Sequence, residues 1–356
     1  MKKIKVLIVD DSAVVRELLN QNLNADPEIE VVGTAMDPLF AMEKIMRNPP
    51  DVITLDVEMP RMDGLTFLGK LMDKYPIPVV MISSLTQKGA ETTMKALELG
   101  AVDFIAKPGA NVFRELPTLK QEIITKVKQA AQANLRIATR KTGAKVGDGT
   151  RVNPPTVSGG LHQGVNQHTL VVLGASTGGV TAVTEVIKGM GPGSFSVLVV
   201  VHMPAGFTTS FAQRLNGLRG WHCSEAQDGE LLQPGHIYVA PGGQNTVVRK
   251  TREGLALALL PVEPNDVFKP NINKTFASVA QTLGPKAIGV IMTGMGDDGS
   301  RGLLLMQQKG ACTLAQNRET CMIYGMPNKA VEIGAVQSVL PLNEIGPTVM
   351  QLVGKE

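Results

Sequence analysis

Short apolar runs of strand length alternate with helical segments along the chain, and this alternation limits the fold more than any other feature. In residues 1–125 helices are expected from about Ser12 to Leu23, up to about Arg47, after Gly64, around residues 90–99 and from about Leu116. Such alternation predicts a parallel, doubly wound α/β sheet, which binds ligands at the carboxyl ends of its strands. The apolar runs are IKVLIVD (4–10), EVVGTA (30–35), DVITLD (51–56), PVVMIS (78–83) and DFIAKP (103–108).

Polar residues stand at the ends of four of these runs. They are Asp10, Asp11, Asp56, Ser83 and Lys107. Three carboxylates at one sheet edge repel one another unless a cation lies among them, and oxygen ligands of this kind suit Mg²⁺. Lysine and serine would add a positive charge and a hydroxyl donor for phosphoryl oxygens. The alternative, that each acid is only a solvated turn residue, is less favoured for the whole set.

The same segments resemble the receiver domain of two-component response regulators over about the first 125 residues. The matching stretches are VDDS (9–12), LDVEMPRMDG (55–64), MISS (81–84) and GAVDFIAKP (100–108). This resemblance implies a flavodoxin-like fold and phosphorylation of Asp56 by a histidine kinase. The sequence departs from the common pattern at Ser83, where many receivers have threonine. Phe104 replaces a common tyrosine and lacks its hydroxyl.

The resemblance also assigns roles around Asp56. Mg²⁺ would be bound by Asp10, Asp11 and Asp56 with a backbone contribution near Glu58, and the phosphoryl group would be contacted by Ser83 and Lys107.

The positive net charge belongs to one segment. Residues 1–125 carry a net charge of −4 and residues 167–356 carry +1, whereas residues 126–166 carry +6. Residues 126–166 have no aromatic residue and are rich in Gly, Thr, Gln and Pro. This composition predicts a flexible basic linker, whose first part could continue a helix. An acidic protein surface or a neighbouring domain could bind it; nucleic acid is a weaker alternative.

After the linker a second α/β pattern begins. Its strand-like runs are TLVVLGAS (169–176), SVLVVVHM (196–203), HIYVAP (236–241) and AIGVIMTG (287–294). Helices are expected after the first and second runs and over residues 272–283. Residues 236–260 have the pattern of an antiparallel hairpin inserted between parallel units. The sequence thus predicts a doubly wound parallel sheet with a hairpin.

A Gly-x-Ser-x-Gly turn ends the first of these runs at residues 174–178, where it would expose Ser176 before a helix. A dinucleotide-binding turn is disfavoured, because Ser176 occupies the position of a required glycine and the next strand ends in His202 rather than an acid. His202 would lie on the same rim and could act as the base for Ser176.

The base needs an acid, and TGMGDDGS (293–300) supplies two at the end of another strand. Its glycines, Gly294 and Gly296, are expected to leave backbone amides free for an oxyanion. The remaining histidines, at positions 162, 168, 222 and 236, are expected in the linker or in loops without acid partners, as surface or packing residues.

Three stretches together resemble the catalytic domain of the chemotaxis protein-glutamate methylesterase family: GASTGG (174–179), VVVHMP (199–204) and TGMGDDG (293–299). The resemblance covers residues 167–353 and has the family's chain order of serine, histidine and aspartate. It implies a triad of Ser176, His202 and Asp298, with Met295 as a backbone oxyanion donor and Thr177 lining the site. Asp297 is the adjacent alternative to Asp298.

These resemblances predict a receiver domain (1–125), a linker (126–166) and a methylesterase domain (167–356). The expected function is phosphorylation-activated hydrolysis of glutamyl methyl esters on methyl-accepting chemotaxis receptors, releasing methanol, with deamidation of selected glutamines. Ester hydrolysis should need no metal. Three alternatives remain: a DNA-binding output, disfavoured by the charge of +1 and the lack of a helix-turn-helix pair; an inactive interaction module; and a general carboxylesterase.

The remaining expectations concern the setting of the chain. Its longest aliphatic runs, such as residues 197–201, are far shorter than the roughly 20 residues that span a bilayer, so no membrane insertion and a cytoplasmic location are expected. Cys223, Cys312 and Cys321 lack metal-binding spacing and are expected to be reduced packing residues. Nothing in the sequence requires more than a monomer.

Overall fold

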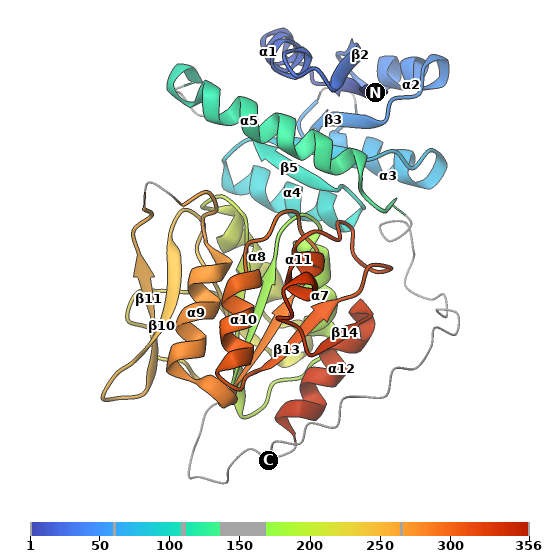
Figure 1. Cartoon of the computed structure of the whole chain (residues 1–356). Helices are drawn as coiled ribbons and strands as arrows, with labels where there is room; N and C mark the ends of the chain where they lie inside the picture. Colours follow the sequence, from blue (N-terminus) through green and yellow to red (C-terminus); the bar gives the residue numbers. More distant parts are fainter. Residues whose placement is uncertain (1, 60–61, 108–111, 136–168, 264–265, 355–356) are drawn as a thin grey trace. The chain divides into compact units, whose positions relative to one another are not determined.

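The computed structural model of the chain describes residues 2–59, 62–107, 112–135, 169–263 and 266–354 (Figure 1). The chain forms two compact units divided at residue 143, and each is considered by itself. Most of the expected linker, residues 136–166, lies outside the described residues, as do His162 and His168. The expected divisions at residues 125 and 167 stay predictions.

The N-terminal unit is a five-stranded parallel sheet in the order β2-β1-β3-β4-β5, the flavodoxin-like order that was expected. Its strands are β1 (Ile4–Val9), β2 (Ile29–Ala35), β3 (Val52–Asp56), β4 (Val79–Ser83) and β5 (Asp103–Ala106). Its helices are α1 (Ala13–Asn24), α2 (Pro38–Arg47), α3 (Gly64–Lys74), α4 (Gln87–Glu98) and α5 (Val112–Ala131).

Capping side chains set the start of the first four helices. Each side chain accepts a hydrogen bond from a backbone amide of the first turn, which would otherwise have no partner. The caps are Ser12, Asp37, Asp63 and Thr86. Helix α5 begins at Val112, earlier than the expected Leu116.

The C-terminal unit contains a seven-stranded parallel sheet in the order β14-β13-β12-β6-β7-β9-β8. The strands are β6 (Thr169–Ala175), β7 (Phe195–Val201), β8 (His222–Glu225), β9 (His236–Val239), β12 (Ala287–Ile291), β13 (Cys312–Gln316) and β14 (Ser338–Leu340). The helices are α7 (Gly179–Lys188), α8 (Phe207–Leu215), α9 (Ile272–Thr282), α10 (Ser300–Gln308), α11 (Met326–Glu332) and α12 (Leu342–Val353), with 3₁₀ turns at Leu218–Gly220 and Gly284–Lys286.

The order of these strands creates one switch point in the sheet. The chain starts at β6, proceeds outward through β7 toward β9 and β8, and then returns to β12 on the other side of β6. In doubly wound sheets, the crevice at the carboxyl ends of the strands beside such a reversal is the preferred ligand site. The ends of β6, β7 and β12 therefore meet at this crevice.

The expected hairpin over residues 236–260 is correct only in part. The antiparallel pair consists of β10 (Asn245–Lys250) and β11 (Leu255–Leu260), whereas β9 pairs in parallel with β7. The pairing of β9 with β7 places Val239 beside Val199, so β9 extends the main sheet. The apolar run of β9 fits either arrangement, and periodicity alone does not separate them.

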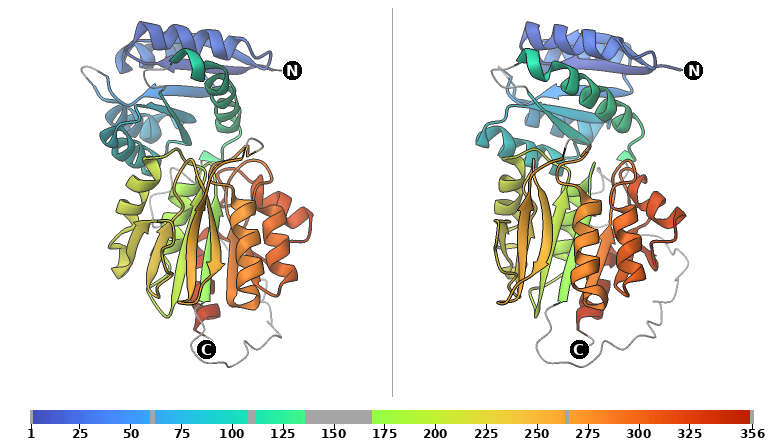
Figure 2. Two further views of the ribbon diagram at one scale, coloured as in Figure 1. Left: turned by 90° about the vertical axis from the view of Figure 1, so that its left-hand side faces the viewer. Right: turned by 60° about the vertical axis from the view of Figure 1, so that its left-hand side comes forward.

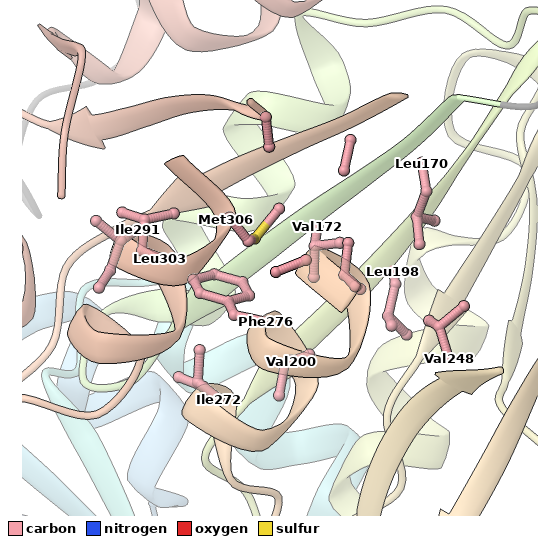
Figure 3. Packing of buried hydrophobic residues seen from close by; sticks show 14 of the residues in the cluster. Leu170, Val172, Leu198, Val200, Val248, Ile272, Phe276, Ile291, Leu303 and Met306 are labelled. Atoms are coloured by element: carbon pink, nitrogen blue, oxygen red, sulfur yellow. The ribbon is translucent and has the colours of Figure 1, made fainter. Parts of the chain in front are cut away.

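A continuous apolar layer lies between this sheet and the neighbouring helices α9 and α10, which lie side by side in both views of Figure 2. Alternate residues of β6 and β7 face this layer because side chains in a strand alternate between faces. Figure 3 shows the packing of Leu170, Val172, Leu198 and Val200 with Phe276, Leu303 and Met306. No described helix is both long and apolar enough to cross a bilayer.

Candidate active site and phosphoryl-acceptor site

Ser176 follows the last residue of β6 and stands at a tight turn into α7. Its N–H donates to Thr293 O at 2.9 Å, and its carbonyl accepts from Gly179 N at 2.6 Å. Gly178 has a φ of +77°, and a Cβ there would lie 2.8 Å from Met322 Cβ. Only glycine adopts this conformation without strain, so the turn holds the serine at the edge of the sheet.

His202 follows β7, the strand beside β6, and its ring connects Ser176 to Asp298. Its Nδ1 lies 3.1 Å from Ser176 Oγ, and its Nε2 lies 2.8 Å from Asp298 Oδ2. A carboxylate only accepts hydrogen bonds, so Nε2 carries the proton and Nδ1 is free to accept from the serine hydroxyl. The structure thus brings together the three residues expected to form a triad, and this is the arrangement that a nucleophile and its base require.

Asp298 is almost fully buried, with 2% of its surface exposed, and it also caps a helix. Its Oδ2 accepts from Ile272 N at 2.8 Å and its Oδ1 from Asn273 N at 2.9 Å, which are the first amides of α9. Burial alone would raise the pKa of this carboxyl, but hydrogen bonds from His202 and these amides lower the pKa below its ordinary value. Asp298 is therefore held ionised beside His202.

Asp297, the alternative acid, is exposed. Its carbonyl accepts from Ser300 N at 3.1 Å and Ser300 Oγ at 2.6 Å, which fixes the turn before α10. Its position favours Asp298 for the role of the acid.

The expected oxyanion region lies next to the serine, with one correction. Gly294 N donates to Ile323 O at 3.0 Å, so this amide is not free as expected. A Cβ at Gly294 would lie 2.7 Å from Ser176 Cβ, so the lack of a side chain permits the close approach. Met295 is exposed, and Thr177 is buried with its carbonyl accepting from Thr293 Oγ1 at 3.0 Å.

Two further residues of this site were not anticipated. The ring of Phe268 stacks on His202 with centroids 4.4 Å apart, and no motif in the sequence marks it. Gln316, buried at the end of β13, accepts from Thr293 N at 2.9 Å through Oε1. The rule of polar residues at strand ends would have found Gln316.

The expectation that His222 and His236 lie in loops is wrong. They begin neighbouring strands β8 and β9, where they are register partners. His236 Nε2 lies 2.9 Å from Ser224 Oγ, and burial lowers the pKa of its ring below the ordinary value. The cysteines are free thiols, and burial raises the pKa of Cys223 to about 12.

At the carboxyl edge of the N-terminal sheet, three acidic side chains converge. Asp10, Asp11 and Asp56 each offer a carboxylate oxygen within 4.8 Å of the others. Lys107 Nζ lies 2.8 Å from Asp56 Oδ2 and 3.2 Å from Asp10 Oδ2. Asp10 and Asp56 are buried, whereas Asp11 is exposed.

This cluster has the chemistry of a Mg²⁺ site. Burial raises the pKa of Asp56 to about 6 and also raises the pKa of Asp10, since the nearby lysine only partly offsets the loss of water. Asp10 Oδ2 has no hydrogen-bond partner of good geometry, although Lys107 lies close to it. A divalent cation would satisfy this oxygen and offset the repulsion, and hard carboxylate oxygens suit Mg²⁺.

The other expected phosphoryl-site residues lie around this cluster. Glu58 N donates to Asp56 Oδ1 at 3.4 Å, and the Glu58 side chain is not part of the acidic group among the described residues. Ser83 Oγ is buried and donates to Gly89 O at 3.1 Å in α4. Phe104 is buried, and Lys126 Nζ lies 4.9 Å from the centroid of its ring.

The two units define a receiver-type signalling module followed by an α/β unit with a serine-hydrolase arrangement. Family models match both: the response regulator receiver domain over residues 6–115 and the CheB methylesterase over residues 171–349. The chain belongs to the CheB methylesterase family. The expected family and fold class are thereby confirmed.

Two relatives match this chain over nearly its full length. A protein-glutamate methylesterase/protein-glutamine glutaminase of Bordetella parapertussis is 46% identical over 99% of this chain and 98% of its own length. One of Xanthomonas campestris pv. campestris is 47% identical over 98% and 97%, respectively. The crystal structure of the Thermotoga maritima CheB methylesterase catalytic domain is 33% identical, with a TM-score of 0.50, over 52% of this chain and 99% of that one.

Proposed function

We propose that the chain is a phosphorylation-activated serine hydrolase that removes methyl groups from glutamyl methyl esters of methyl-accepting chemotaxis receptors and deamidates selected receptor glutamines. The observation that carries the proposal is the His202 ring, which connects Ser176 Oγ to the buried Asp298 carboxylate. The names of the full-length relatives supply the substrate class. The receptors are the substrate partner, and the cytoplasm is the expected location.

The geometry suggests a sequence of steps. Ser176 Oγ attacks the ester carbonyl as its proton passes to His202 Nδ1, and Asp298 stabilises the imidazolium through Nε2. Met295 N–H is proposed to stabilise the oxyanion, with Thr177 lining the site. The proton then goes from His202 to the leaving methoxide, which departs as methanol. Water, activated by the same histidine, hydrolyses the acyl-enzyme and regenerates Ser176.

The receiver is proposed to regulate this reaction through Asp56, with a chemotaxis histidine kinase as phosphoryl donor. Asp10, Asp11 and Asp56, with a backbone group near Glu58, would hold Mg²⁺, which supplies charge neutralisation for phosphoryl transfer. Lys107 and Ser83 would then contact the phosphoryl oxygens. Phosphorylation adds roughly −1.5 to −2 charges by analogy with phosphoserine, enough to bias an equilibrium between inhibited and active states.

Methanol release from receptor cytoplasmic fragments carrying glutamyl methyl esters tests this function. Wild type and Ser176→Ala are each assayed with and without a small phosphoryl donor plus Mg²⁺. We expect release by wild type, stimulation by the donor, and loss in Ser176→Ala. No release by wild type would leave an interaction module as the better reading, whereas rapid hydrolysis of simple small esters would favour a general carboxylesterase.

Deletion of residues 1–150 tests the regulatory part separately. Removal of an inhibitory receiver should raise the basal rate of methanol release. An unchanged basal rate would contradict inhibition by the receiver but not the hydrolase assignment.

A further inference from the structure

Phe268 covers one face of His202 at the active site. The two rings are nearly parallel, with an interplanar angle of 5° and centroids 4.4 Å apart. Ser176 and Asp298 hold the two nitrogens at the edge of the histidine ring. These contacts lie in the plane of the ring, so they do not prevent the ring from tilting out of that plane. The stacked ring supplies that restraint and helps to keep the His202 side chain only 11% exposed.

The segment that carries Phe268 is anchored on both sides by one buried residue. Asn245 Nδ2 donates to Asp266 Oδ2 at 2.7 Å, while its Oδ1 accepts from Asn271 N at 3.0 Å. Lys274 of α9 adds an ion pair to Asp266 at 2.9 Å. Asn245 has no exposed surface, so these contacts are not exchanged for water. The polypeptide on either side of Phe268 is thus fixed to β10 and α9.

The neighbouring residue shows that this segment is not simply packed core. Val267 is 81% exposed, whereas Phe268 turns inward onto the histidine. The segment thus directs a single aromatic ring at the residue proposed to accept the serine proton.

We propose that Phe268 is a positioning residue of the active site: it fixes the plane of His202 and lies against the imidazolium that forms as Ser176 loses its proton. The face of an aromatic ring attracts a cation, and the attraction is stronger where water is excluded. The contact therefore becomes more favourable as the reaction proceeds, which is the condition for lowering a barrier. This inference rests on the proposed serine-hydrolase function.

Three variants test the inference with a probe that needs no receptor. A fluorophosphonate reacts when Ser176 Oγ forms a bond to phosphorus, fluoride leaves, and the serine proton passes to His202. Phe268→Leu keeps an apolar side chain without a ring, and Phe268→Tyr keeps the ring. Gly296 has no side chain to meet the added hydroxyl, and a Cβ there would lie 3.9 Å from Phe268 Cζ. Val267→Ala is the matched control.

We expect Phe268→Leu to lower the rate constant for labelling by about tenfold, and Phe268→Tyr and Val267→Ala to remain within about twofold of wild type. In the methanol assay Phe268→Leu should lower kcat with little change in KM, because the ring acts through His202 and not on bound substrate. Thermal unfolding should be similar in all variants, since the anchors of the segment are unchanged.

Labelling of Phe268→Leu at the wild-type rate would overturn the positioning role, as would equal losses in Phe268→Leu and Phe268→Tyr. Wild type that is labelled but releases no methanol would contradict the proposed substrate and leave the positioning role in force. Wild type that is not labelled at all would overturn both, because Ser176 would then not be an activated nucleophile.

Discussion

The carboxylate of Asp298 both orients His202 and caps α9, and the two roles share its two oxygens. It accepts from His202 and from the first amides of α9, so its charge is stabilised by the helix end while it orients the imidazole. Asp56 shows the opposite situation. Its environment raises the pKa, and the charge that it needs for phosphorylation is costly without a cation.

Asp298→Asn should lower methanol release by about 10⁴-fold, since an amide at this position favours the wrong tautomer of His202. It should also cost about 1 kcal/mol of stability through the weakened cap of α9. Asp297→Asn is the matched control and should retain activity within a few-fold. Methanol release and thermal unfolding of both variants measure the difference; a larger loss in Asp297→Asn would exchange the two assignments.

Asp56 predicts an unusual dependence of stability on pH in EDTA. Burial raises the pKa of Asp56 from 3.8 to about 6 in the folded state. The stability that the protonated carboxyl contributes to the N-terminal unit is therefore fully present below pH 3.8 and is lost as the pH rises through about 6. Asp56→Asn removes the buried charge and should stabilise the N-terminal unit by up to about 3 kcal/mol at pH 7, with little effect near pH 4. Urea unfolding at both pH values measures this; an equal effect at both would refute it.

Among the elements, most of the strands up to β12 followed from apolar runs, because this signal is local, whereas β13, β14, α11 and α12 were not predicted. The site residues at the ends of β6, β7 and β12 also followed, since parallel strands place their carboxyl ends together. Strand β8 (His222–Glu225) did not, because its sequence HCSE is short and polar and is stabilised by pairing with β9. Phe268 was not predictable either: its contact with His202 depends on the path of a loop fixed by Asn245.

Gly294 allows the turn after β12 to approach the turn after β6 closely. Its Cβ would lie 2.4 Å from Met326 Sδ and 2.7 Å from Ser176 Cβ. Gly294→Ala should therefore displace Ser176 and lower activity by about 10²-fold, with a stability loss of about 1–3 kcal/mol. Gly191→Ala, where no atom lies within 4 Å of the added carbon, should change neither property. Fluorophosphonate labelling and thermal unfolding test the pair, and full activity in Gly294→Ala would show that the turns can separate.

At the scale of the whole molecule, each unit has its own sheet, its own core and its own candidate site. The two family resemblances and the basic composition of residues 126–166 predicted two domains, and the bounds at residues 125 and 167 stay predictions. The proposed inhibition by the receiver could not be derived in the same way, because neither sequence pattern specifies the contacts on which it would depend.

Mg²⁺ should stabilise only one of two unfolding transitions. At a concentration of about 100 times its Kd, the ion should raise the stability of the N-terminal unit by about 2.7 kcal/mol and leave the C-terminal unit unchanged. Asp11→Asn should abolish this shift with little effect on the fold, because Asp11 is exposed. Calorimetry with and without Mg²⁺ measures both transitions. An equal shift of both would place the ion elsewhere.

The turn between β10 and β11 divides the hydrolase into complementary parts. Residues 251–254 are exposed, and they separate Ser176 and His202 on one side from Asp298 on the other. A chain cut there leaves neither fragment with a full catalytic set, while the β10–β11 pairing offers a template for their reassociation. The C-terminal unit is therefore suited to a split-enzyme reporter, in which ester hydrolysis returns only when two fused partners bring the fragments together.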